Sequence, residues 1–129
     1  MSAPARRHDA PRARPELGSG TVLTVGGMGV VLVLTAAALH LGAASAAAHR
    51  ARAAADLSAL AAASAVQSGI ADPCTPAGVM ARRNGARLAG CEAAGGERVR
   101  VHVVTGVALS WPGLPDDAMA SAVAGPADP

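Results

Sequence analysis

The side chains that could do chemistry in this chain of 129 residues are few and far apart. A zinc site needs about four ligands, usually supplied as closely spaced pairs of Cys or His. The four histidines instead lie in separate segments, at His8, His40, His49 and His102. Their spacing predicts no metal site.

Two other patterns only imitate a functional motif. Asp116-Asp117 pairs two carboxylates, but the pair follows Pro115 and is typical of a turn or a helix cap. Gly26-Gly27-Met28-Gly29 is rich in glycine, yet it lies inside an apolar stretch, whereas a phosphate-binding loop joins a strand to a helix. We therefore predict no catalytic residue, no cofactor and no small-molecule substrate, and so a protein that is not an enzyme.

The basic side chains do not predict a nucleic-acid site either. The formal net charge is only +2, and the positive charge is concentrated toward the N-terminal end. Arg82-Arg83 and the Arg98/Arg100 pair lack interleaved aromatic side chains, since the chain has one Trp and no Phe or Tyr. We expect no nucleic-acid partner.

Cys74 and Cys91 are the pair whose spacing suggests a structural role. One straight helix between them would hold its ends roughly 20 Å apart, whereas a disulfide needs Cα atoms within about 7 Å. A helix that stops at Asn84-Gly85, followed by an extended return, brings Cys91 back toward Cys74. An intramolecular disulfide and a helix-turn-strand arrangement thus support each other. Two unbridged thiols and an intermolecular bridge are the alternatives.

A long apolar segment precedes these elements. Residues 17–39 contain no charge, and apart from His40 the uncharged run continues to Ala48. A helix needs about 20 apolar residues to cross ~30 Å of hydrocarbon. The segment therefore predicts a transmembrane helix at about residues 21–43, with His40 at the membrane interface.

The charges that flank this segment predict its orientation. Four arginines precede it and two follow it closely: Arg6, Arg7, Arg12 and Arg14, then Arg50 and Arg52. By the positive-inside rule, residues 1–17 form a basic cytoplasmic leader, expected to be disordered, and the chain after the span lies outside the cytoplasm. We expect a single-pass protein of the cell membrane.

A cleavable signal peptide is the alternative to a retained anchor. Ala44-Ser45-Ala46 fits the A-x-A cleavage pattern, and cleavage after Ala46 would release a small secreted binding protein. The long uncharged run and its helical continuation favour the anchor. Residues 49–67 are rich in Ala and hold no Gly or Pro, so one helix is expected from about residue 20 to residue 67.

The stretch from Arg50 to Ala63 reads Arg-Ala-Arg-Ala-Ala-Ala-Asp-Leu-Ser-Ala-Leu-Ala-Ala-Ala. With Gly-Ser-Gly at 18–20, Asn84-Gly85 and the closing Ala-Val-Ala-Gly-Pro of 122–126, it resembles the TadE/TadG-like proteins of tight-adherence (Flp) pilus-assembly systems. The resemblance covers about residues 18–126 and is closest to the short TadE-like proteins of high-GC bacteria that are encoded beside helicase and secretion genes. Its most specific part is a helix-packing motif: Ala54, Ala55, Asp56, Ala59, Leu60 and Ala61.

The resemblance implies a pilin-like membrane component of a Tad-type pilus or secretion assembly. Its partners would be other Tad-type proteins or copies of itself. Pilins of this class are usually cleaved after a Gly that is followed five residues later by Glu. Here that position holds Leu23 after Gly18 and Val25 after Gly20. Gly18 and Gly20 are thus candidate processing sites without the Glu, and Ala46 is the candidate for signal peptidase.

The rest of the chain predicts a small exported α+β head at residues 69–126, with 127–129 as a tail. We expect a helix at 77–83 with Thr75 as its N-cap, strands at 87–92 and 98–103, and a hairpin turn at 93–96. Residues 111–117 predict a loop, and 119–124 either an edge strand or a short helix. The predicted fold class is α+β and pilin-like: a long N-terminal helix within 18–68, a small helix and a short antiparallel hairpin or sheet.

Overall fold

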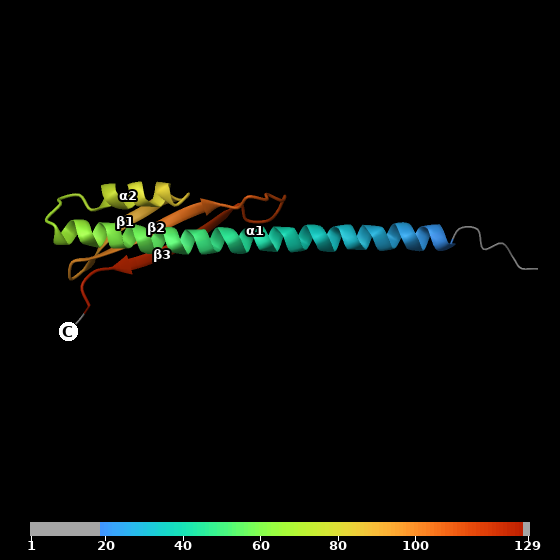
Figure 1. Ribbon diagram of the computed structural model, residues 1–129, viewed down its shortest axis with the longest axis horizontal. Helices are drawn as coiled ribbons and strands as arrows, with labels where there is room; N and C mark the ends of the chain where they lie inside the picture. Colours follow the sequence, from blue (N-terminus) through green and yellow to red (C-terminus); the bar gives the residue numbers. More distant parts are fainter. Residues whose placement is uncertain (1–18, 128–129) are drawn as a thin grey trace, which may run out of the picture. The chain divides into compact units, whose positions relative to one another are not determined.

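The computed structural model describes residues 19–127 of the chain. It contains helix α1 (Ser19–Gln67), helix α2 (Cys74–Arg83) and strands β1 (Arg87–Gly95), β2 (Arg98–Gly106) and β3 (Asp117–Ala124) (Figure 1). The chain divides into two units, Met1–Leu34 and Thr35–Pro129. The α+β fold class is therefore confirmed. The predicted leader at 1–17, the candidate processing site Gly18 and the last two residues of the predicted tail lie outside the described residues.

Helix α1 ends where the chain adopts a conformation that glycine favours. Gly69 has φ +72°, its N–H donates to the Val66 carbonyl, and the Ile70 N–H donates to the Ala65 carbonyl. This pair of hydrogen bonds is the Schellman arrangement, which satisfies carbonyls that the last helical turn leaves unpaired. The end at Gln67 agrees with the sequence prediction.

Helix α2 begins earlier than predicted, at Cys74, so Thr75 is a helical residue and not the N-cap. The Asp72 carboxylate takes the capping role, because it accepts hydrogen bonds from the Cys74 N–H at 3.0 Å and from Thr75 Oγ1 at 2.6 Å. The end of α2 is as predicted. Asn84 lies at its C-cap and Gly85 follows with φ +71°.

The three strands form one antiparallel sheet in the order β1-β2-β3. The turn between β1 and β2 lies at Gly96 and Glu97, with φ +59° and +60°, so the predicted turn at 93–96 is wrong. Positive φ at both central positions defines a type I′ turn, whose twist matches that of the strands. Because Ala93 and Gly95 pair with β2, β1 continues beyond the predicted strand at 87–92. Residues 119–124 lie in a strand, β3, which decides between the two alternatives.

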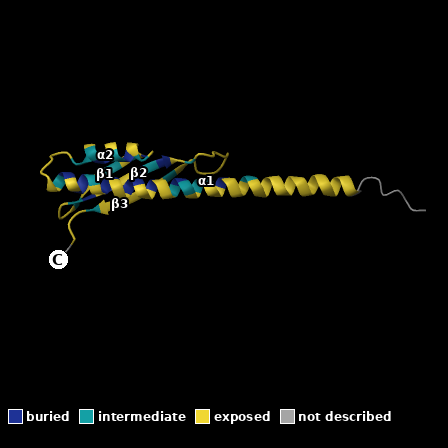
Figure 2. Cartoon of the chain, in the orientation of Figure 1, coloured by how far each residue is buried: buried dark blue, intermediate teal, exposed yellow. Residues whose placement is uncertain are grey.

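The core of the second unit is built almost entirely from Ala and Val. Ala51, Ala54 and Ala55 of α1 pack with Val103 of β2 in one cluster, and Ala59 and Ala62 pack with Val99 and Val101 in a second. The α1 residues in this core are dark in Figure 2. Small side chains let a helix approach a sheet closely, but each buries little apolar surface.

A glycine in the closing segment is needed for a close backbone approach. A Cβ at Gly125 would stand 2.8 Å from the Cα of Arg98, closer than side-chain atoms normally come. Gly125 therefore lets the chain leave β3 directly over the start of β2. This gives a physical reason for the Gly in the Ala-Val-Ala-Gly-Pro sequence at 122–126.

Candidate functional site

Within residues 19–127, no group of three or more His, Cys, Asp or Glu side chains is placed to hold a metal ion. One cluster of charged and titratable side chains lies on the exposed face of the sheet. Glu92 Oε1 lies 3.4 Å from Arg100 Nη1 and 4.0 Å from His102 Nε2, and all three side chains are about half exposed. Exposed ion pairs of this kind contribute little stability. The candidate functional features described next are surfaces.

The first surface is the apolar stretch of α1 in the first unit. Its large side chains are 59% to 75% exposed within the chain: Val22, Leu23, Val25, Met28, Val30, Val31, Leu32, Val33 and Leu34. Among the described residues, α1 is the one helix long and apolar enough to cross a membrane. Contiguous exposed apolar surface of this extent calls for a lipid or protein environment.

The second surface is formed by α1 inside the second unit, where the distribution of side-chain size is the reverse of a normal amphipathic helix. Between residues 47 and 65 the buried face consists of Ala with one Ser, whereas Leu57 and Leu60 are 41% and 58% exposed. The exposed positions Ala53, Leu57, Leu60 and Ser64 are spaced by four, three and four residues. That spacing places them on one face, as in the seam of a coiled coil.

The predicted helix-packing motif is divided between these two faces. Ala54, Ala55 and Ala59 are buried by the unit's own sheet and second helix, and they therefore belong to its core. Asp56 and Leu60 are exposed and Ala61 is half-buried. The sequence did not separate the two groups, because an Ala-rich helix has little contrast between its faces.

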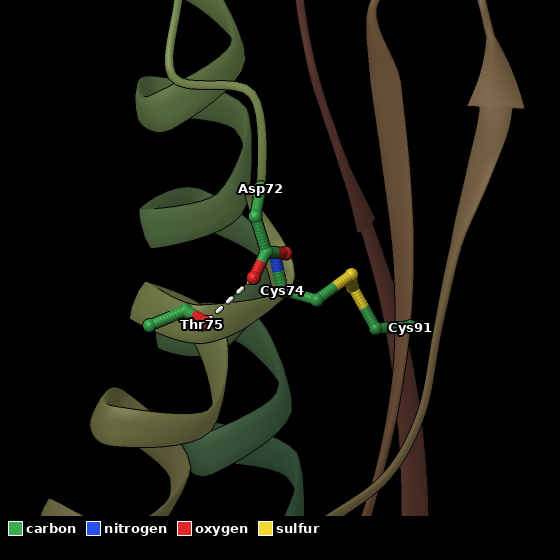
Figure 3. Close-up of a disulfide and its surroundings, with 4 residues drawn as sticks. All are labelled: Asp72, Cys74, Thr75 and Cys91. Atoms are coloured by element: carbon green, nitrogen blue, oxygen red, sulfur yellow. Dashed lines mark hydrogen bonds between the residues drawn. A yellow bond between two sulfur atoms is a disulfide. The ribbon is translucent and has the colours of Figure 1, made fainter.

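The disulfide lies between α2 and β1. Cys74 and Cys91 are joined, with their Cα atoms 5.9 Å apart, and no cysteine of the chain is left unbridged (Figure 3). Next to the bridge, the pKa of Asp72 is held below its usual value. The main cause is the hydrogen bond that its carboxylate accepts from the Thr75 side chain, and the second is the one from the Cys74 N–H. The bridge ties the start of α2 to the middle of β1, an edge strand of the sheet.

The remaining candidate positions lie along α1. Gly20 is exposed in its first turn, and Ala46 is half-buried in its middle. His40 is only 8% exposed within the chain, and its place at the membrane interface stays a prediction. It lies seven residues before the fully buried Ala47, so both are on the same face, the one that the second unit covers.

One exposed feature was not singled out from the sequence: the loop between β2 and β3, predicted only as irregular structure. Leu109, Trp111 and Leu114 are 41%, 51% and 46% exposed there. The Leu114 N–H donates to the Trp111 carbonyl at 3.0 Å, and Gly113 has φ +87°. With Pro112 before that glycine, residues 111–114 form a type II turn. The sequence signal that could have indicated this feature was Trp111-Pro112-Gly113, a turn sequence that contains the chain's only Trp.

The fold and these surfaces define a small α+β protein with a candidate membrane helix and no recognisable catalytic centre among the described residues. Residues 18–65 match the family described as putative Flp pilus-assembly TadE/G-like. The predicted resemblance is thus confirmed over the apolar stretch and the Ala-rich helix. The finer resemblance to short TadE-like proteins, and its extension to residue 126, stay predictions. No curated protein and no solved structure matches the chain.

Proposed function

We propose that this protein is a non-catalytic, pilin-like membrane component of a Tad-type pilus or secretion assembly, and that it acts by helix-helix packing. Residues 21–43 anchor it as a single span. The N-terminus lies in the cytoplasm and the head outside it, in line with the arginine distribution around the span. Its partners are other Tad-type proteins or further copies of this chain.

The observation that carries this proposal is the pair of leucines on the outer face of α1. A helix that served only its own head would place its largest apolar side chains toward the sheet. Here Ala fills the buried face, and Leu57 and Leu60 point away from it. At 1.5 Å per residue, Leu57 lies ~20 Å beyond residue 43, too far for the lipid of the span to cover it. A helix from another subunit fits this narrow seam of Ala, Leu and Ser.

A site-specific photo-cross-linker at Leu60 tests the proposal in native membranes. We expect cross-links to a Tad-type membrane protein or to another copy of the chain, identified by mass spectrometry. The same cross-linker at Arg83, an exposed residue of α2, is the matched control and should give no such product. Recovery of equal, unspecific products from both positions would contradict a partner helix at this face.

A further inference from the structure

We infer that the loop between β2 and β3 is a membrane-contacting element: Leu109, Trp111 and Leu114 insert into the interfacial layer of the bilayer that holds the α1 span. The inference rests on the proposed membrane anchor and adds a second point of contact with the same membrane. It assigns a role to the only aromatic side chain of the protein.

The first step is the position of the loop within the second unit. Ala59 and Ala62 of α1 pack with Val99 and Val101, whereas Ala51 and Ala54 pack with Val103, farther along β2. Moving along β2 toward the loop therefore means moving along α1 toward its N-terminal residues. Figure 1 shows the loop at this end of the sheet.

The second step is the burial of α1 beyond the end of the sheet. Ala51 of α1 packs in the same cluster as Val103, which lies toward the C-terminal end of β2. The helix nevertheless stays buried at positions before Ala51, since Ala47 is fully buried and His40 is 8% exposed. From Ala51 to His40 the helix advances ~16 Å. Strand β2 ends at Gly106 and β3 begins at Asp117, so the loop between them is the part of the unit that continues in this direction. It thus reaches the level of His40, within the predicted outer boundary of the span.

The third step is the chemistry of the loop. Residues 107–115 carry no charge, and three large apolar side chains remain about half exposed. A Trp beside aliphatic side chains is typical of the membrane interface, where the indole ring lies among the headgroups.

The fourth step is that the loop is held in shape. The Val107 N–H donates to the Asp116 carbonyl at 2.6 Å, and Ser110 Oγ donates to Asp116 Oδ1 at 2.6 Å. The type II turn then fixes Trp111 and Leu114 at its first and last positions. A preformed loop loses little conformational freedom when it inserts, which favours binding.

The same end of the unit carries charged groups of both signs. Arg82 and Arg83 lie in the last turn of α2, and Arg87, which pairs with Val104, begins β1 near the end of β2. Asp116 and Asp117 lie where the loop returns to β3. The three arginines outnumber the two carboxylates, and this excess of positive charge suits the surface of a bilayer that contains anionic lipid. The occupant that these observations favour is therefore lipid rather than another protein.

The single Trp makes the inference directly measurable, because the chain has no Tyr or Phe. The full-length protein is reconstituted in vesicles of phosphatidylcholine and phosphatidylglycerol, with and without phosphatidylcholine brominated in its acyl chains. We expect bromolipid to remove about half of the Trp111 emission, as for an interfacial Trp, and aqueous acrylamide to quench it weakly. The double variant Leu109→Asn/Leu114→Asn should lose most of the bromolipid quenching.

Ile70→Asn provides the matched control, since Ile70 is 52% exposed, much as Leu109 and Leu114 are, but follows the C-terminal end of α1, away from the loop. It should leave the quenching unchanged. Protein that floats with the vesicles but shows strong acrylamide quenching and no bromolipid quenching overturns the inference while leaving the anchor intact. A blue-shifted emission without bromolipid quenching also overturns it and assigns the loop to a protein contact. Failure to float with the vesicles overturns the proposed anchor and this inference with it.

Discussion

The first and second parts of helix α1 use side-chain size in opposite ways. In residues 22–34 the large apolar side chains are exposed within the chain, and in residues 47–65 the buried side chains are almost all Ala. Both parts are helical, but the first carries no charged residue and the second carries Arg50, Arg52 and Asp56. The comparison teaches that the size of the apolar side chains depends on what the helix face packs against. Lipid accommodates Val and Leu at any angle, whereas a sheet packed closely against a helix leaves room only for Ala.

The largest expected effect comes from breaking the first part. Leu32→Arg places a charge near the centre of the span, at a cost of about 2.5 to 3.5 kcal/mol for membrane insertion. We expect the variant to be lost from the membrane fraction. Leu60→Arg, in the second part of the same helix, should remain there. Equal membrane retention of both variants, measured by fractionation and immunoblotting, would contradict a span at about residues 21–43.

The disulfide sharpens the comparison, because only the second part depends on a folded core. Replacing both Cys74 and Cys91 by Ala opens a loop with a sequence separation of 17 residues. The chain-entropy model then predicts a loss of about 3 kcal/mol in the free energy of unfolding of the head. Membrane retention should not change. Thermal melts in detergent measure the stability of the head, and fractionation measures membrane retention. An unchanged melting temperature in the double variant would show that the disulfide is dispensable for stability.

The Ala face of α1 can be tested by adding volume to it. Ala55 is fully buried beside Val103, so Ala55→Leu should destabilise the head by about 1 to 3 kcal/mol through overpacking. Ala53→Leu places the same side chain on the exposed face and should change stability by less than about 0.5 kcal/mol. Chemical denaturation of the two variants gives the comparison. Similar values for both would mean that the sheet does not pack closely on α1.

The smallest expected effect is the pH dependence conferred by Asp72. Its pKa is lowered in the folded protein, chiefly by the hydrogen bond from Thr75, so the ionised carboxylate stabilises the fold. This contribution is present above the unfolded pKa of about 3.9 and is lost as the pH falls through the lowered folded value. The wild-type protein should therefore have a higher melting temperature than Asp72→Asn at neutral pH. This difference in melting temperature should vanish in acid.

Asp56→Asn, on the exposed face of α1, controls for the general loss of a charge. NMR titration of Asp72 in wild type and in Thr75→Ala checks the cause. We expect the pKa of Asp72 to rise in Thr75→Ala. An unchanged value in that variant would assign the lowering to another group.

Local signals in the sequence predicted much of this fold. The length of the apolar run, the absence of Gly and Pro in 49–67, and Gly69 after it gave α1 and its end. Asn84-Gly85 gave the end of α2, and the alternating valines gave β2. One error lies where nonlocal contacts decide: strand pairing carries β1 past Ala93 and moves the turn to Gly96 and Glu97. The other is local, because the Asp72 carboxylate that caps α2 at Cys74 lies only two residues before it.

The sequence by itself determined that the chain has a long apolar helix, a short helix and valine-rich strands, because helix propensity, turn residues and alternation act over a few residues. The tertiary structure alone decided which face of the Ala-rich helix is buried, since identical small side chains carry no periodic signal. It alone turned Leu57 and Leu60 outward. It also brought Leu109, Trp111 and Leu114 to the end of the sheet that leads toward His40, because only the packing of α1 on β2 fixes that direction.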